Sequence, residues 1–140
     1  TARPLVSLLA LECGEPIGHI LFTSARLDGA EAPVRCSLLV RLAVSPNARR
    51  RGIGSRLIAA GLEKLREIGV DLVFVLGYSS YYRRAGFTPA ADFGLTAPFP
   101  VADEHADAWM ALPLHDRPLG SVTGTVRCAA SLNHPEYWQQ

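Results

Sequence analysis

Apolar side chains recur at helical spacing in the middle of the chain. Between residues 52 and 68 the charged side chains fall on the opposite side of a helix with 3.6 residues per turn. The apolar positions are Ile53, Leu57, Ile58, Gly61, Leu62, Leu65 and Ile68, and the charged ones are Arg56, Glu63, Lys64, Arg66 and Glu67. The pattern predicts an amphipathic helix over about residues 52–68. Gly69 follows it, where a helix end favours a residue that adopts positive φ.

Short apolar runs rich in strand-forming residues precede and follow this helix. Residues 5–11 and 17–23 are joined by a polar turn, which predicts an antiparallel hairpin. Residues 26–33 predict a polar loop, and residues 36–44 predict a third strand beside the second. Because a strand at 36–44, the helix and an apolar run at 71–76 follow in order, the two strands are expected to pair in parallel. The predicted sheet is therefore mixed.

The remainder of the chain predicts a loop followed by two closing strands. Residues 90–102 are dense in Gly and Pro and predict a loop, and residues 108–112 and 120–126 predict strands. At 140 residues, the chain is expected to form one domain over residues 1–140. The fold class expected is α/β (α+β).

The composition argues against several classes of binding partner, namely nucleic acids, membranes and metal ions. The formal net charge is +1, so basic character is local, and nucleic-acid binding through an arginine cluster is the weakest of the functional hypotheses. The sequence contains three widely spaced cysteines, which indicate reduced thiols and a cytoplasmic protein. No apolar run reaches the length of a membrane span, and the histidines and cysteines show no metal-ligand spacing. Neither a membrane nor a metal is expected.

A glycine-containing turn lies between the third strand and the helix, at Arg49-x-x-Gly52-x-Gly54. The first amide groups of a helix have no intrahelical acceptor, and the helix dipole favours an anion there. A Walker loop requires a lysine that is missing after Gly54, and a dinucleotide fingerprint requires a glycine or alanine where Leu57 stands. The turn therefore predicts a phosphate site of another kind, or only a solvated arginine cluster at a helix start.

A second motif decides between these interpretations. Tyr81-Tyr82-Arg83-Arg84-Ala85-Gly86-Phe87 follows the apolar run 71–76. With both motifs in this order, residues 5–114 resemble the GNAT superfamily of acetyl-CoA-dependent N-acetyltransferases, most closely a YhbS-like bacterial branch. The resemblance implies a mixed, mostly antiparallel central sheet with a splayed parallel pair and flanking helices. The strand and helices with which family members usually begin do not precede the predicted hairpin in the sequence given, either because the protein lacks them or because this sequence omits them.

The resemblance also implies a set of site residues. Backbone groups on the third strand would bind pantetheine, and the turn would bind the pyrophosphate of coenzyme A. These cofactor-binding residues are Leu42, Ala43, Val44, Arg49, Arg50, Arg51, Gly52, Ile53, Gly54 and Ser55, with Arg84 as a further phosphate contact or a solvated helix arginine. Tyr82 matches the family tyrosine that faces the cofactor sulfur, where it would act as general acid or merely pack.

The implied reaction transfers an acetyl group from acetyl-CoA to a primary amine of a small molecule or protein, by direct transfer in a ternary complex. The strand that precedes the turn offers only Arg41 as a charged residue, so no carboxylate base is identified. An inward-facing Arg41 would favour an acceptor bearing a carboxylate or phosphate. In place of a carboxylate, a water chain would deprotonate the amine. Residues 103–105 would border the acceptor site or, as is more typical of charged loop residues, form only a solvated surface loop. The alternative is a degenerate domain that binds acyl-CoA without catalysis, and a homodimer is possible.

Overall fold

The computed structural model describes residues 4–29, 34–98, 108–115 and 123–128. Eight strands, two α-helices and two 3-10 helices are assigned within these ranges. In chain order they are β1 (Pro4–Glu12), β2 (Glu15–Asp28), β3 (Cys36–Val44), η1 (Pro46–Ala48), α1 (Ile53–Glu67), β4 (Leu72–Leu76), α2 (Ser79–Arg83), β5 (Thr88–Pro89), η2 (Ala91–Phe93), β6 (Leu95–Thr96), β7 (Trp109–Pro113) and β8 (Gly124–Cys128).

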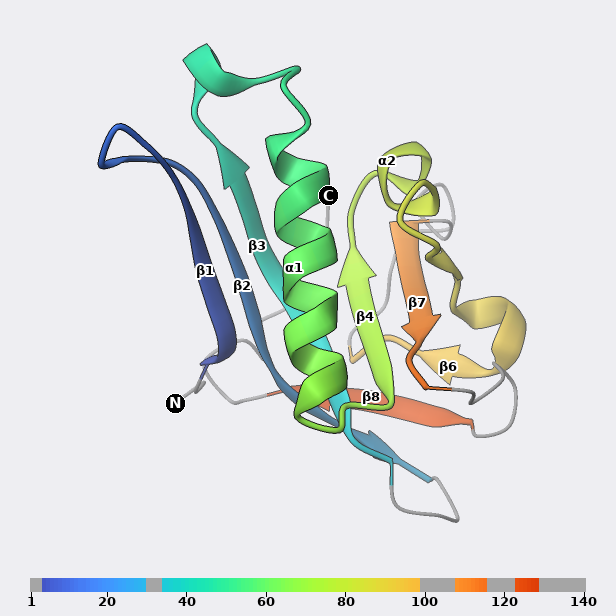
Figure 1. Ribbon diagram of the computed structural model, residues 1–140. Coiled ribbons are helices and arrows are strands. Elements are labelled where there is room, and N and C mark those ends of the chain that lie inside the picture. The colour runs from blue at the N-terminus through green and yellow to red at the C-terminus, as the bar shows by residue number, and fades with distance from the viewer. Residues whose placement is uncertain (1–3, 30–33, 99–107, 116–122, 129–140) are drawn as a thin grey trace.

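All eight strands belong to one mixed sheet (Figure 1). The order is β5-β7-β4-β3-β2-β8-β6, with β1 paired to β2. The β1–β2, β2–β3, β2–β8, β4–β7 and β5–β7 pairs are antiparallel, and β3–β4 and β6–β8 are parallel. The sequence-based prediction of a mixed, mostly antiparallel sheet with a parallel central pair is confirmed.

The parallel pair β3–β4 comes apart along its length. Pairing begins at Cys36 with Leu72 and ends at Leu39 with Val75, after which β3 runs on to Val44 while β4 stops at Leu76. Figure 1 shows the two strands side by side at one end and separated at the end where η1 and α2 lie. The backbone of the last five residues of β3 therefore has no neighbour on the β4 side.

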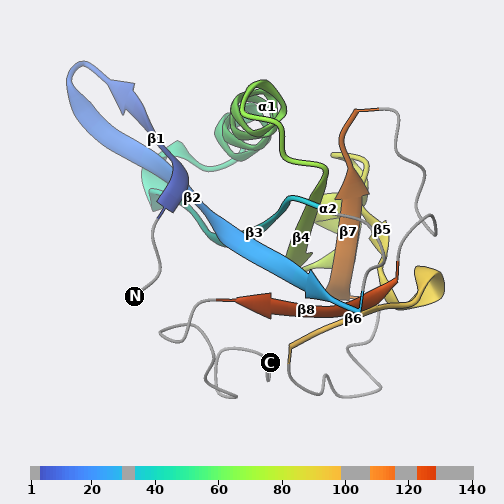
Figure 2. The ribbon, with the colours of Figure 1, turned by 90° about the horizontal axis from the view of Figure 1, so that it is seen from below.

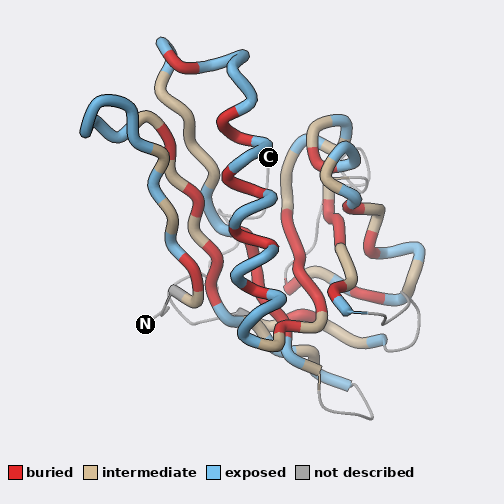
Figure 3. Tube along the Cα trace, viewed as in Figure 1, coloured by how far each residue is buried: buried red, intermediate tan, exposed pale blue. Residues whose placement is uncertain are grey.

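One face of the sheet is covered by α1, whose buried stripe follows the predicted helical spacing (Figures 2 and 3). The stripe consists of Ile53, Gly54, Leu57, Ile58, Gly61, Leu62 and Leu65. Gly61 lies where the helix meets β2, because a Cβ at this position would be 2.3 Å from a ring carbon of Phe22. Phe22 is fully buried, so the close approach of helix and sheet depends on the missing side chain at Gly61.

Substitution of Gly61 by alanine has two opposing effects on the free energy of unfolding, one from helix propensity and one from packing. Alanine is favoured over glycine in a helix by about 1 kcal/mol, so propensity alone predicts that Gly61→Ala stabilises the fold. We expect the opposite, because overpacking against Phe22 costs about 1–3 kcal/mol. Urea denaturation of Gly61→Ala measures the net change, and Ala60→Gly at the exposed neighbouring position measures the propensity contribution. A Gly61→Ala protein that is more stable than the wild type would contradict this packing.

A second hydrophobic cluster lies on the sheet face opposite α1. Phe74 of β4 and Trp109 of β7 stack with ring centroids 5.4 Å apart, and the Trp109 indole N–H donates to the Leu95 carbonyl oxygen at 3.0 Å. Val126 of β8 is fully buried in the same cluster. These contacts join the late strands to the central pair and hold β4 in position.

Three segments differ from the sequence-based predictions. The predicted loop at 26–33 is wrong at its start, because β2 continues to Asp28 by pairing with β8 on its far edge. The predicted loop at 90–102 contains η2 and the short strand β6, which pairs with β8 through Leu95 and Gly124. The last predicted strand, 120–126, ends at Cys128 in the structure, where β8 spans Gly124–Cys128, and residues 120–122 of the prediction lie outside the described residues. Each difference involves β8, whose partners are distant in sequence.

Helix length also bears on membranes. Within residues 4–29, 34–98, 108–115 and 123–128, no helix is both long and apolar enough to cross a bilayer.

Candidate active site

A cleft of about 840 Å³ occupies the opening between β3 and β4. The two strands contribute its walls, and the η1–α1 turn and α2 border it at the end where the strands separate. The lining residues are Leu39, Val40, Arg41, Leu42, Ala43 and Val44 from β3, Val75 and Leu76 from β4, Ala48, Arg49, Arg50, Gly52, Ile53, Gly54 and Ser55 from the turn and helix start, and Gly77, Tyr78, Tyr81, Tyr82 and Arg84 around α2. Separation of one parallel strand pair thus brings both sequence motifs to one cavity.

The turn into α1 presents unpaired amide groups to this cleft. Gly52 is the N-cap residue with φ of 76°, and neither a side-chain cap nor an acidic residue in the first turn satisfies the helix start. The first α-helical hydrogen bond runs from the Arg56 amide to the Gly52 carbonyl oxygen at 3.1 Å, so the amides of Ile53, Gly54 and Ser55 precede the first intrahelical donor. A Cβ added at Gly52 would meet nothing within 4 Å, which leaves the space beside these amides open.

Gly54 is required for contact between the two motifs. A Cβ at Gly54 would be 2.1 Å from the Tyr81 hydroxyl oxygen, closer than two atoms can approach without displacement. The tyrosine side chain of α2 therefore lies directly over the first turn of α1. The second glycine of the turn motif serves this packing in addition to exposing the backbone.

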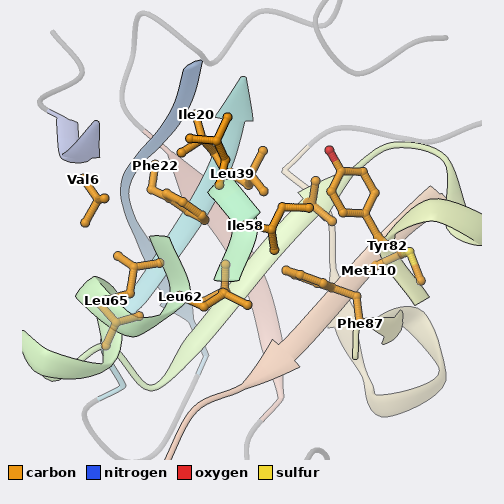
Figure 4. Close-up of a cluster of buried hydrophobic side chains, with 14 of the residues drawn as sticks. Val6, Ile20, Phe22, Leu39, Ile58, Leu62, Leu65, Tyr82, Phe87 and Met110 are labelled. Atoms are coloured by element: carbon orange, nitrogen blue, oxygen red, sulfur yellow. The ribbon is translucent and has the colours of Figure 1, made fainter. Parts of the chain in front are cut away.

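Tyr82 lies at the base of the cleft with only its end accessible. The residue is 8% exposed, and its ring makes edge contacts with Tyr81 and Phe87 at centroid distances of 5.2 and 5.8 Å. Gly77 is packed against the ring, since a Cβ there would be 2.5 Å from a ring carbon. Figure 4 shows the hydroxyl directed away from Phe87 and Met110. The ring is fixed by packing, and the hydroxyl is left at the cavity.

Burial of Tyr82 disfavours its ionised form. Loss of hydration is the larger cause and the electrostatic effect of Tyr81 the smaller one, and together they raise the pKa of Tyr82 from 10.0 to about 12. The phenol is therefore neutral and able to donate a hydrogen bond at any physiological pH. Because the folded pKa exceeds the unfolded one, the neutral phenol's contribution to stability is complete below pH 10 and is lost as the pH rises through about 12.

The raised pKa gives a titration that can be measured directly. We expect the absorbance of the Tyr82 phenolate, taken as the difference between wild type and Tyr82→Phe, to appear near pH 12 and not near pH 10. For the same reason, ionisation of Tyr82 should cause no decline in turnover between pH 9 and 10.5, a range that lies below its raised pKa. A difference titration centred near pH 10 would show that the ring is hydrated and would contradict its buried position.

The arginines predicted to bind the cofactor, from the turn and from α2, divide into two groups. Arg49, Arg50 and Arg84 line the cleft. The Arg51 side chain is instead ion-paired and hydrogen-bonded with Glu12 of the β1–β2 hairpin, and this arginine lowers the pKa of the Glu12 carboxyl. The structure therefore places the Arg51 side chain outside the cavity where the sequence predicted it. The hairpin contact was not foreseeable from the turn motif, because Glu12 is 39 residues away.

All other predicted site residues lie together. Residues 42–44, Arg49, Arg50, residues 52–55, Tyr82 and Arg84 line one cavity, whereas the predicted acceptor loop 103–105 lies outside the described residues. The end of β4 at residues 75–77 also lines the cavity without having been predicted, and its signal in the sequence is the glycine directly after the apolar run. The described residues of the cleft lining include four arginines and no carboxylate. Within the described ranges, no group of three or more His, Cys, Asp or Glu side chains is arranged to hold a metal.

Known proteins with similar sequences and folds support the assignment of this cleft as the active site. The chain is 45% identical over 130 residues to the uncharacterized N-acetyltransferase YjhQ of Escherichia coli (strain K12), with 92% of this chain and 71% of that protein covered. Among solved structures, it resembles the GNAT family N-acetyltransferase YhbS from Escherichia coli in complex with CoA. That match has a TM-score of 0.84 and 29% identity over 94% of this chain and 71% of that one.

A second solved structure has a similar fold and sequence. It is a GNAT family acetyltransferase from Brucella melitensis in complex with acetyl-CoA, with a TM-score of 0.67 and 30% identity over 91% of this chain and 68% of that one. The model of the Acetyltransferase (GNAT) family matches residues 2–87, which include β3, the arginine-glycine turn and the tyrosine pair. The chain therefore belongs to the GNAT family of N-acetyltransferases.

Proposed function

We propose that this N-acetyltransferase transfers the acetyl group of acetyl-CoA directly to a primary amine of a small molecule or protein, within a ternary complex in the β3–β4 cleft. The observation that carries the proposal is one cavity that joins the free amides at the start of α1 to the Tyr82 hydroxyl along an unpaired strand edge. This arrangement matches the chemistry of coenzyme A, which has anionic phosphates at one end, an amide-containing arm and a sulfur at the other.

Different parts of the cleft suit different parts of the cofactor. The amides of residues 52–55 and the side chains of Arg49 and Arg50 are donors for the pyrophosphate, and Arg84 is a donor for a further phosphate. The backbone of Leu42, Ala43 and Val44 pairs with β2 on one edge and is open on the other, so it offers hydrogen-bonding groups to the pantetheine arm. These backbone groups need no reorganisation during the reaction.

Tyr82 is suited to moving a proton between the two reacting groups. Acetyl-CoA supplies a thioester carbon: the amine nitrogen forms a bond to it, the carbon–sulfur bond breaks, and the proton lost by nitrogen ends on sulfur. A phenol with a pKa of about 12 is too weak an acid to protonate a thiolate alone. Tyr82 therefore donates its proton to the departing sulfur as it receives one from the amine, directly or through water, and remains neutral overall.

The positive charge of the cleft lowers the pKa of the acceptor amine, an effect that a carboxylate base would otherwise have to supply by removing the proton. An acceptor amine reacts only as the neutral form, and nearby cations lower the pKa of an ammonium group. Arg41, Arg49, Arg50 and Arg84 line the cavity, and among the described lining residues there is no carboxylate. The charge of these arginines therefore favours loss of the amine proton to water before attack.

Turnover distinguishes catalysis from binding alone. Purified protein is given acetyl-CoA and a panel of primary amines, and release of the free thiol is followed with a disulfide reagent while the acetylated product is identified by mass spectrometry. Transfer that depends on both substrates supports the proposal. Tight binding of coenzyme A with no transfer to any amine would instead favour the binding-only alternative.

Cellular location and assembly are further proposals. We propose a cytoplasmic, bacterial protein, because the similar proteins come from Escherichia coli and Brucella melitensis and because Cys13 is exposed as a thiol. A homodimer is tested by light scattering of the eluted protein at several concentrations.

A further inference from the structure

Arg41, the charged residue of β3, occupies a position that binding of coenzyme A does not explain. Leu42 and Val44 pack against the core under α1, so Arg41 and Ala43 lie on the opposite face of the strand. Arg41 is two positions beyond Leu39, the last residue of β3 that pairs with β4. It therefore stands where the two strands begin to separate, in the same cavity as Tyr82.

Arg41 is also separated from the phosphate-binding end of the cleft. Arg49, Arg50 and Arg84 belong to the turn and to α2, whereas Arg41 lies on the strand, roughly 10 Å of extended chain before Val44. In the described part of the chain the Arg41 side chain is exposed and makes no ion pair or hydrogen bond. The cofactor phosphates have other donors, so this guanidinium is available for another anion.

Among the described residues, the surroundings of Arg41 present no negative charge to an acceptor. Its neighbour across the β2–β3 ladder is Leu21, and Ala43 is the next residue of β3 on the same face. Beyond Ala43, a second hollow of about 260 Å³ is lined by residues of β1 and β2, namely Leu9, Pro16, Ile17, Gly18 and His19, with Ala43, Val44 and Ser45. It shares Ala43 and Val44 with the main cleft, and none of its described lining residues is a carboxylate. The described part of these surfaces therefore offers an anion, not a polyamine, its counter-charge.

We infer that Arg41 selects an acceptor in which the primary amine is accompanied by a carboxylate or phosphate. The guanidinium binds that anion at the point where β3 and β4 separate, and thereby holds the amine beside the thioester and Tyr82. This inference rests on the proposed function, because it assigns a substrate class to the same cleft. Arg41 is a specificity residue that contacts the acceptor anion and neither donates nor accepts a proton.

Binding to the complex with coenzyme A tests the inference without requiring turnover. The probes are O-phosphoethanolamine and β-alanine, which carry an anion, and ethanolamine and putrescine, which do not. Dissociation constants are measured by NMR titration of the saturated coenzyme A complex, for the wild type, Arg41→Gln, Arg41→Lys and Arg66→Gln. Arg66 is the matched control, since it lies on the exposed side of α1 and pairs with Glu63.

We expect the anionic amines to bind the wild type about tenfold more tightly than ethanolamine, as a charge-assisted contact implies. Arg41→Gln should lose this preference, Arg41→Lys should keep part of it, and Arg66→Gln should match the wild type. Affinity for coenzyme A should stay within about twofold in all three variants. Equal binding of the four probes, no measurable binding of any, or a preference that survives in Arg41→Gln would overturn the inference.

The same titration separates this inference from the proposed function. If the anionic amines bind through Arg41 but no acetyl transfer occurs, the acceptor assignment stands and catalysis is refuted. If amines are acetylated at rates that ignore their charge, in both wild type and Arg41→Gln, catalysis stands and the assignment is wrong.

Discussion

Replacement of Tyr82 by phenylalanine should lower kcat about 100-fold or more, with the dissociation constant for acetyl-CoA unchanged within about threefold. The ring is held by Tyr81, Phe87 and the surface of Gly77, and phenylalanine preserves all of these contacts. Only the hydroxyl is removed, and no residue in the described part of the chain hydrogen-bonds to it. Steady-state kinetics and calorimetric titration measure the two quantities on the same preparation.

The control for this substitution is Ser24→Ala. Ser24 is exposed on β2 and lies outside the cleft lining, so the loss of its hydroxyl should leave kcat within about twofold. A Tyr82→Phe enzyme with wild-type turnover would remove the phenol from the reaction. A parallel loss of acetyl-CoA affinity would mean that Tyr82 acts in binding and not in proton transfer.

Charge reversal at Arg50 should weaken coenzyme A binding about 100-fold, which corresponds to about 2.7 kcal/mol. Arg50 lines the cleft beside the amides of the helix start, so a glutamate would replace a phosphate donor by a repelling anion. Arg50 has a φ of 66°, and because neither arginine nor glutamate is favoured there, the substitution adds no backbone strain of its own.

The Arg51→Glu variant is the matched control for the loss of coenzyme A affinity in Arg50→Glu. Arg51 carries the same charge one residue away, but its side chain binds Glu12 and does not line the cleft. We expect its affinity for coenzyme A to change less than about fivefold, because only long-range screened charge is altered. Equal losses in the two variants, measured by calorimetry, would mean that Arg51 leaves Glu12 to bind the cofactor.

Local patterns were sufficient to predict the elements around the site. The 3.6-residue period placed α1 to within one residue of its observed ends, and the run 36–44 coincides with β3. Strand, turn and helix are contiguous here, so the amides at residues 52–55 are positioned by neighbouring sequence alone. The tyrosine motif reached the same cavity because α2 follows directly after β4.

Contacts between distant segments were not accessible in this way. The pairing of β2 with β8 joins residues about a hundred positions apart, for example Arg127 and Asp28, whose side chains are 3.1 Å apart. The Glu12–Arg51 pair likewise depends on how the hairpin lies against the turn. Neither segment carries a local signal of its partner, because an exposed charge on a strand or turn is equally typical of a solvated surface.

The most direct test of the account is an amide-resolved NMR titration of the wild-type protein with acetyl-CoA. If the cleft between β3 and β4 is the cofactor site, the largest shifts will occur at the amides of residues 42–44 and 52–55 and around Tyr82, with β8 and the far end of α1 unaffected. Saturable shifts centred elsewhere, or none at millimolar acetyl-CoA, would contradict the assignment of this cleft.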